Sequence, residues 1–260
     1  MPKSSDAIRK ANLDGNLGLI IYSIPNFPDP ETYLAVLNEL ESNSFVSVLE
    51  TTFPVADRYS EYANETIQNA HHTAIQYESG LGSIDHLQTI SKPKICVLYR
   101  ATYEDEGFTK ILDYSQGNLD GILFEWEVES DSDFVSLGQQ RNIEVIHCAG
   151  SYLTEAEVDD LAKKLPQNPL IYFEAASMTG AELSDIDEMK QFAKLLKSKR
   201  PDFCLAAGFG VKTPEDVALL AGIEEMDAVI VGTAFLQAIE KGTASAIDYV
   251  DSITRSLTRS

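Results

Sequence analysis

Eight short apolar segments alternate with amphipathic segments along the whole chain, and this alternation limits the possible fold more than any other feature. Several of the apolar segments are continuous runs, which is typical of strands buried on both faces of a parallel sheet. The predicted strands are Leu17–Ser23, Val46–Glu50, Lys94–Arg100, Gly121–Trp126, Glu144–Ala149, Leu170–Ala175, Phe203–Ala207 and Ala228–Val231. The predicted helices are Pro30–Asn43, Glu65–Ser79, Glu106–Ser115, Ser132–Arg141, Thr154–Leu165, Ile186–Ser198, Pro214–Ala221 and Phe235–Leu257, with extra helical turns at Ser83–Thr89. Eight strand–crossover units in 260 residues predict one domain over residues 1–260, a single (β/α)8 TIM barrel.

Two glycine-containing turns follow the last two predicted strands. Gly208, Phe209 and Gly210 follow one strand, and Gly232 and Thr233 follow the other. Glycine lets the backbone approach a ligand closely, and the N–H groups at a helix start favour an anion. In a (β/α)8 barrel, the loops after strands 7 and 8 frequently form a phosphate site. The pattern predicts a phosphate site here, with two tight turns as the alternative interpretation.

The formal net charge of −21 argues against nucleic acid and anionic membrane surfaces as partners. A phosphorylated substrate is then expected to be held by local N–H groups, since Lys212 is the one basic residue in the two turns. The chain has no apolar run near the ~18 residues of a membrane span, and its first residues lack the apolar core of a signal peptide. Cys96, Cys148 and Cys204 lie in apolar runs without metal-ligand spacing, which predicts buried free thiols in a cytoplasmic protein.

Five motifs, in the correct order along nearly the whole chain, resemble the tryptophan synthase alpha chain family. Residues 48–54 read VLETTFP, close to the family's Leu-Glu-x-Gly-x-Pro signature. Residues 66–70 read TIQNA and match the helix start that follows, and residues 178–180 read MTG, like the end of the family's loop after strand 6. The turns at Gly208–Val211 and Val231–Ala234 match its two phosphate turns.

This resemblance implies an enzyme of tryptophan biosynthesis that cleaves indole-3-glycerol phosphate to indole and glyceraldehyde 3-phosphate, without a metal or an organic cofactor. It implies a tryptophan synthase beta chain as partner, contacted through the loop after strand 2 and the loop after strand 6. The implied substrate-binding residues are Tyr99, Thr179, Gly180, Gly208, Phe209, Gly210, Gly232 and Thr233. Trp126, near where the family usually has an aspartate at the end of strand 4, is a further candidate, either to stack on the indole or to fill part of its pocket.

Glu50 is the main candidate for the catalytic acid or base. It ends an apolar strand, the position at which barrel enzymes carry catalytic groups, and it matches the family's catalytic glutamate. A glutamate facing an apolar barrel is expected to have a raised pKa, as proton transfer at neutral pH requires. The alternative is a strand-end carboxylate turned to solvent.

The second carboxylate of the family, which holds the indole N–H, aligns with Ala63, in a loop about two residues longer than the family's. Asp57 fits the family's first aspartate in this loop, and Glu61 or Asp57 is a candidate substitute for the second; ordinary solvated loop charges are the alternative. Ala175 stands where the family has arginine, and Glu174 adds a carboxylate. These departures leave two further hypotheses open: a related phosphate-binding barrel enzyme with another substrate, and a non-catalytic homologue that regulates a beta chain.

Overall fold

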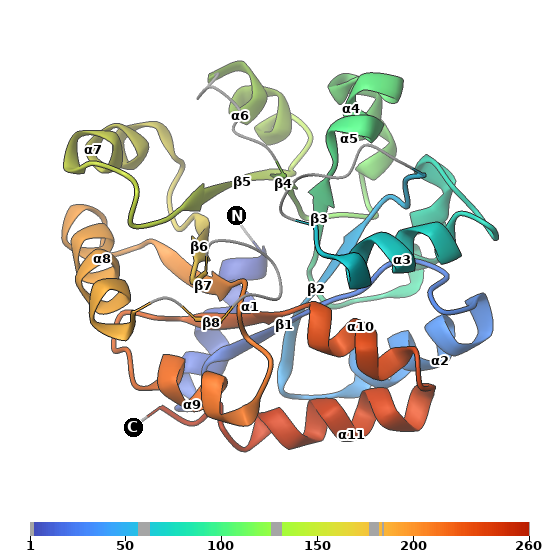
Figure 1. Ribbon diagram of the computed structural model, residues 1–260. Helices are drawn as coiled ribbons and strands as arrows, with labels where there is room; N and C mark the ends of the chain where they lie inside the picture. The colour runs from blue at the N-terminus through green and yellow to red at the C-terminus, as the bar shows by residue number, and fades with distance from the viewer. Residues whose placement is uncertain (1–2, 57–62, 126–131, 177–181, 184, 260) are drawn as a thin grey trace.

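The computed structural model describes residues 3–56, 63–125, 132–176, 182–183 and 185–259. Eight parallel strands close into a barrel in chain order, and β8 pairs with β1, which confirms the predicted (β/α)8 fold. Figure 1 looks into the barrel, with the helices arranged around the strands. The strands are β1 Gly18–Tyr22, β2 Val46–Thr52, β3 Lys94–Leu98, β4 Gly121–Phe124, β5 Glu144–Ala149, β6 Leu170–Glu174, β7 Cys204–Gly208 and β8 Ala228–Val231.

The helices fall close to their predicted positions, and two of them begin with capping boxes, at Thr154 and Thr213. The helices around the barrel are α2 Pro30–Ser42, α3 Glu65–Ala74, α4 Arg100–Glu106, α5 Phe108–Ser115, α6 Ser132–Gln139, α7 Glu155–Lys164, α8 Ile186–Lys199, α9 Pro214–Ala221, α10 Thr233–Ile239 and α11 Thr243–Thr254. The extra turns before β3 form a 3-10 helix, η1 Leu81–Thr89, as predicted.

Two predicted helices were wrong in extent because glycines in left-handed conformation interrupt them. Gly107, at φ 75°, separates α4 from α5. Helix α4 begins at Arg100, where the sequence predicted the end of a strand. Gly242, at φ 106°, divides the predicted helix Phe235–Leu257 into α10 and α11. Residues other than glycine rarely adopt such angles, so each glycine fixes a change of direction.

The strands bury side chains on both faces, which accounts for their continuous apolar runs. Ile20, Val48 and Ile95 belong to the cluster that fills the barrel interior, whereas Leu49 packs in the layer between the strands and the outer helices. Successive residues of a strand point to opposite faces. The residues that continue the Ile20 and Val48 series therefore face the open end of the barrel, here called the mouth, where the carboxyl ends of the strands meet.

Helix α1, Lys3–Leu13, was not predicted, and it covers the opposite end of the barrel. Its fully buried Ile8 joins the interior cluster, and a Cβ on Gly18 of β1 would lie 2.9 Å from the Ile8 side chain. The helix has only a narrow apolar face, since most of its residues are polar or charged. This explains why its periodicity did not reveal it. With this end closed, the mouth is the face left for a substrate.

Within the described ranges, no helix is both long and apolar enough to cross a membrane. All three cysteines are free; Cys96 and Cys204 are buried, as predicted, whereas Cys148 is only half-buried.

Candidate functional site

Glu50 is a buried carboxylic acid on the interior face of β2. Val48, two residues earlier, fills the barrel interior, so Glu50 points toward the mouth on the same face. Its side chain is 2% exposed, and its Oε1 accepts no hydrogen bond from the described residues. Burial raises the pKa of Glu50 to about 8. The group therefore stays largely protonated at neutral pH and can either donate or accept a proton in that range.

Two buried tyrosines lie near Glu50, on the neighbouring strands. Tyr22 of β1 pairs in register with Glu50, and Tyr99 follows β3 on the other side. Burial raises the pKa of both phenols, and the charge of Glu50 raises them further. Both tyrosines thus remain neutral hydroxyl groups at physiological pH. The position of Tyr99 places it beside Glu50, as the sequence predicted for a substrate-site residue; its role stays a prediction.

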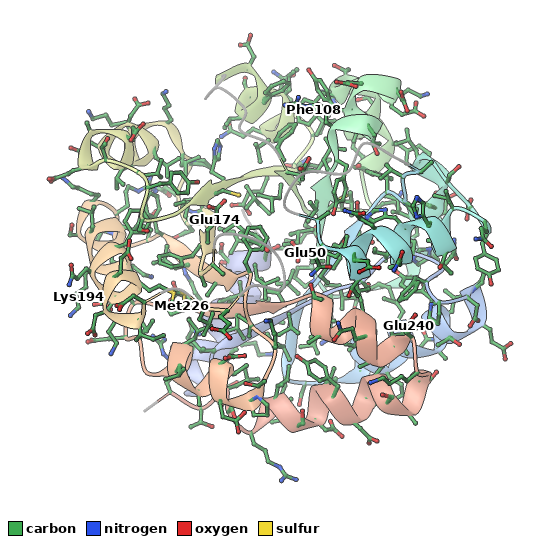
Figure 2. All side chains as sticks on the ribbon, viewed as in Figure 1. Glu50, Phe108, Glu174, Lys194, Met226 and Glu240 are labelled. Carbon is green, nitrogen blue, oxygen red and sulfur yellow. The ribbon has the colours of Figure 1, made fainter. Side chains whose placement is uncertain are left out.

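Tyr172 and Glu174 of β6 face the mouth from the side opposite β2, since three strands lie between β2 and β6 in either direction around the barrel. Figure 2 shows Glu50 and Glu174 near the centre of the molecule, on different strands. Burial raises the pKa of Tyr172, and the charges of Glu50, Cys148 and Glu174 raise it further. Tyr172 was missed in the sequence, although it stands two residues before Glu174 and therefore on the same face of the strand.

Glu174 also raises the pKa of Cys148, which lies on the adjacent strand β5. Burial raises the pKa of the Cys148 thiol, and the charge of Glu174 and its hydrogen bond to the thiol raise it further. The Glu174 Oε2 reaches over Gly150, where an added Cβ would lie 3.2 Å away. Glu125, directly after β4, is a third carboxylate near the mouth, and its charge raises the pKa of buried Tyr99. The mouth is therefore lined by glutamates from β2, β4 and β6.

The turn after β7 has the tight geometry that its glycines predicted. A Cβ on Gly208 would lie 2.3 Å from the Tyr172 ring, so only glycine fits there. Phe209 and Gly210 both have positive φ angles, 66° and 75°. The left-handed conformation costs a residue other than glycine roughly 1–2 kcal/mol, and the Phe209 ring packs 5.5 Å from that of Tyr172. The turn and the β6 side chains thus form one packed unit.

The turn after β8 differs, because its glycine is under less constraint. Gly232 has φ −122°, and an added Cβ would meet Tyr22 at 3.4 Å, an ordinary contact distance. Thr233, the next residue, begins α10, and its Oγ1 accepts a hydrogen bond of 3.0 Å from Nδ2 of Asn64. Thr233 is therefore the residue that links this turn to another part of the fold, through its hydrogen bond with Asn64.

Five of the predicted site residues lie outside the described part of the chain: Asp57, Glu61, Trp126, Thr179 and Gly180. Ala63, which the sequence motifs predict at the position of the family's second aspartate, is described and buried at 6% exposure. Gln68 fixes the backbone there by donating from Nε2 to the Ala63 carbonyl at 2.8 Å. Among the described residues, the additional carboxylates near the mouth are therefore Glu125 and Glu174.

His71 and His72 of α3 hold the backbone at the start of the loop after β2. The Val55 N–H donates to Nδ1 of buried His71 at 3.1 Å, and Nε2 of His72 lies 2.9 Å from the Ala56 carbonyl oxygen. Burial lowers the pKa of His71 to about 3, so the ring stays neutral and can accept this bond. The His71 ring also packs edge-on against Tyr99, 4.9 Å between centroids. Both histidines thus have structural contacts, which sequence reasoning did not foresee.

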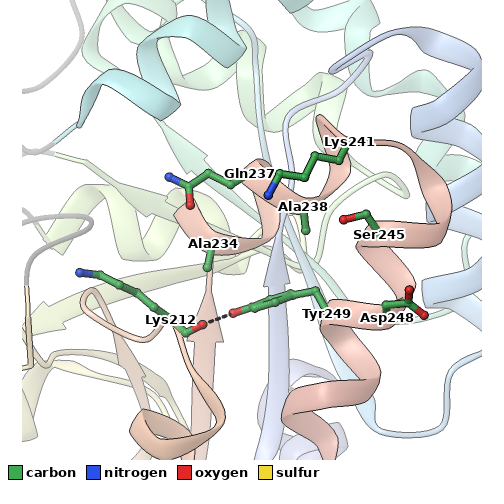
Figure 3. A pocket seen from close by; sticks show the side chains of 8 residues that line it. All are labelled: Lys212, Ala234, Gln237, Ala238, Lys241, Ser245, Asp248 and Tyr249. Atoms are coloured by element: carbon green, nitrogen blue, oxygen red, sulfur yellow. Dashed lines mark hydrogen bonds between the residues drawn. The ribbon is translucent and has the colours of Figure 1, made fainter.

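Lys212 lines a surface hollow between α10 and α11, which also includes Gln237, Lys241 and Tyr249 (Figure 3). The Tyr249 hydroxyl donates to the Lys212 carbonyl at 2.9 Å and so secures the end of the β7 turn. The Lys212 side chain extends away from Tyr249 (Figure 3). The hollow does not include Glu50, so it is separate from the mouth.

These observations define a class of protein: a (β/α)8 barrel with a buried acid and several tyrosines at its mouth, closed at the other end by a helix. A model of the family described as tryptophan synthase alpha chain matches residues 8–258. The chain therefore belongs to the tryptophan synthase alpha chain family, as the sequence motifs suggested, and this membership implies a lyase-type enzyme.

Individual relatives are similar over nearly their whole length. The tryptophan synthase alpha chain of Zymomonas mobilis is 25% identical, with 95% of this chain and 91% of the relative covered. That of Dehalococcoides mccartyi is 27% identical, with 100% and 99% covered. Among solved structures, a Mycobacterium tuberculosis tryptophan synthase has a TM-score of 0.84 at 15% identity, over 98% of each chain. A Legionella pneumophila tryptophan synthase alpha chain has a TM-score of 0.78 at 18% identity, over 99% of this chain and 97% of the other. At such identities the structures show the shared fold.

Proposed function

We propose that this chain is a carbon–carbon lyase that cleaves indole-3-glycerol phosphate to indole and glyceraldehyde 3-phosphate in tryptophan biosynthesis. The observation that carries the proposal is Glu50, a buried strand-end acid that faces the barrel mouth and has a pKa raised to about 8. Family membership over residues 8–258 supports the same reaction.

Cleavage requires two proton movements around one carbon–carbon bond. Indole C3 gains a proton as its bond to the adjoining glycerol carbon breaks, and the hydroxyl on that carbon loses a proton as it becomes the aldehyde. Glu50 is suited to such transfers because its carboxyl group changes charge near the working pH. Tyr22 and Tyr99, both neutral and buried beside it, share a hydrogen bond in which Tyr22 donates, which leaves the Tyr99 hydroxyl to donate toward the substrate.

The phosphate of the substrate is assigned to the turns after β7 and β8. Backbone N–H groups near Gly208, Phe209, Gly210 and Gly232, together with the Thr233 hydroxyl, are the proposed donors. The positive φ angles of Phe209 and Gly210 support this, because successive backbone N–H groups in such a turn form a concave site for an anion. The net charge of −21 repels a phosphate at long range, so neutral N–H and O–H donors at the turns are needed to hold it.

For the second carboxylate, Asp57 and Glu61 remain the candidates from the sequence, with Trp126, Thr179 and Gly180 as further substrate contacts. Glu174 joins them, because it faces the mouth from β6, across the barrel from Glu50. The chain is further proposed to work in the cytoplasm, in complex with a tryptophan synthase beta chain.

The test is glyceraldehyde 3-phosphate release from indole-3-glycerol phosphate by the wild type and by Glu50→Gln, each with and without a beta chain. Turnover that the substitution abolishes supports the lyase. Absence of turnover in both conditions, with the substrate still bound, contradicts it and directs the search to other phosphorylated substrates. Retained beta-chain binding without turnover instead indicates a regulatory homologue.

A further inference from the structure

Asn64 links two parts of the fold that are far apart in the sequence. It precedes α3, and its Oδ1 accepts a hydrogen bond of 3.1 Å from the Ile67 N–H, which caps the helix. Its Nδ2 donates to Oγ1 of Thr233, 169 residues further along, at 3.0 Å. Helices α3 and α10 pack side by side, which brings the two residues together (Figure 1).

The chemistry of the cap fixes which way the Asn64 amide points. A backbone N–H needs an acceptor, so the amide oxygen faces Ile67 and the NH₂ group faces Thr233. An amide NH₂ only donates, and Thr233 Oγ1 is therefore the acceptor of this bond. The hydroxyl proton of Thr233 is left to donate in another direction.

A donor is what a phosphate requires, because the oxygens of a phosphate dianion only accept hydrogen bonds. A threonine hydroxyl otherwise rotates among several partners, and it can accept as readily as donate. By occupying a lone pair of Oγ1, Asn64 disposes the hydroxyl to donate and limits its rotation. The entropy of ordering that hydroxyl is then lost on folding and not on ligand binding.

We propose that Asn64 is a positioning residue of the phosphate site, which holds the Thr233 hydroxyl as a donor toward the substrate's phosphate. This inference rests on the proposed function, in which Thr233 contacts the phosphate. It adds a residue on α3 to a site otherwise built from the turns after β7 and β8.

The test is calorimetric affinity for inorganic phosphate and for glycerol 3-phosphate. Asn64→Ser keeps a good helix cap and is too short to reach Thr233, so affinity falls about tenfold, the order of one hydrogen bond. Asn64→Asp also keeps the cap, but a carboxylate accepts the Thr233 proton and repels the phosphate, so the loss is larger. In turnover, Asn64→Ser raises KM with kcat unchanged, as expected for a binding contact away from the reacting carbon.

Two further variants separate positioning from helix packing. In the Thr233→Val background, Asn64→Ser costs no additional affinity, because the hydroxyl through which it acts is gone. Gln237→Ala is the matched control: it removes a second side-chain bond from α10 to the α3 region, from Gln237 Nε2 to Thr66 Oγ1 at 3.3 Å, and leaves affinity unchanged.

The outcomes distinguish this inference from the proposed function. If the wild type binds neither phosphate compound, the phosphate site is wrong and this proposal falls with it. If the wild type binds them and both Asn64 variants bind equally well, Asn64 is only a helix cap. An equal loss from Gln237→Ala also overturns the proposal, since helix packing then explains the effect.

Discussion

The two halves of the barrel mouth are built in different ways. On the β7–β8 side, the proposed phosphate turns present backbone: Gly208 fits against Tyr172 only because it has no side chain, and Gly210 has a positive φ. Around the rest of the rim, from β1 to β6, the mouth presents carboxylates and phenols, and Glu50 is nearly inaccessible to solvent. The first half is suited to holding an anion, and the second to moving protons.

This difference indicates how each half tolerates change. A backbone donor is present whatever the neighbouring side chains are, so a turn keeps its function as long as its conformation is kept. A carboxylate acts only in one environment, because its pKa depends on what surrounds it. The departures predicted from the sequence motifs, at Ala63 and Ala175, concern side-chain positions, whereas the two glycine turns are predicted to keep the family pattern.

The largest expected effect is on turnover, when the carboxyl group of Glu50 is removed and the phosphate turns are left intact. Glu50→Gln lowers kcat by roughly 10²–10⁴-fold, the usual contribution of a general acid or base, and leaves KM and glycerol 3-phosphate affinity nearly unchanged. Steady-state kinetics and calorimetry on the same samples measure both. Glu144→Gln is the matched control, since Glu144 is a second glutamate with a raised pKa, half-buried where β5 begins at the closed end of the barrel, and its substitution retains turnover. Loss of phosphate binding in Glu50→Gln contradicts the proposal that proton transfer and phosphate binding lie in separate parts of the mouth.

Glu50→Gln and Glu144→Gln also test how the stability of the protein depends on pH. Burial raises the pKa of both Glu50 and Glu144 to about 8 in the folded protein, against 4.5 for an exposed glutamate. Between these values the unfolded chain binds fewer protons, so stability falls as pH rises, by up to about 1.4 kcal/mol per pH unit for each group. Urea unfolding from pH 5 to 8 should give a shallower decline for each glutamine variant. A decline equal to that of the wild type indicates that the carboxyl group is solvated.

On the phosphate side, Gly208→Ala is expected to destabilise the fold by roughly 1–3 kcal/mol, as overpacking does. The new Cβ would lie 2.3 Å from the Tyr172 ring, so the ring or the turn must move. Phosphate affinity falls as well, because Phe209 packs on the same ring. Urea unfolding checks the first effect and calorimetry the second. An unchanged unfolding midpoint shows that the turn adapts without cost.

Gly232→Ala gives the smallest effect, within about 0.5 kcal/mol in unfolding. Its φ of −122° lies outside the left-handed region that favours glycine, and its Cβ would meet Tyr22 at 3.4 Å, an ordinary contact. Measured beside Gly208→Ala, it tests whether the two turns are constrained as differently as their geometry indicates. If Gly232→Ala destabilises the protein as much as Gly208→Ala does, the two turns are equally constrained.

Much of the fold could be predicted because the local signals agree with it. Continuous apolar runs mark strands buried on both faces, and the cap at Thr213 together with Pro214 marks the start of α9. The breaks at Gly107 and Gly242 were missed, because a single glycine is compatible with a helix until its φ angle is known. Helix α1 was missed because its burial depends on Ile8, one residue that fits against Gly18 of a strand.

The sequence by itself determined the barrel, the two glycine turns and Glu50 at the end of an apolar strand, because each follows from neighbouring residues and the period of the strands. Only the tertiary structure decided that Glu50 is buried with a pKa near 8, that Tyr172 and Glu174 face the same mouth from across the barrel, and that Asn64 bonds to Thr233. Burial and contacts over 169 residues arise when the barrel closes, and no local pattern contains them.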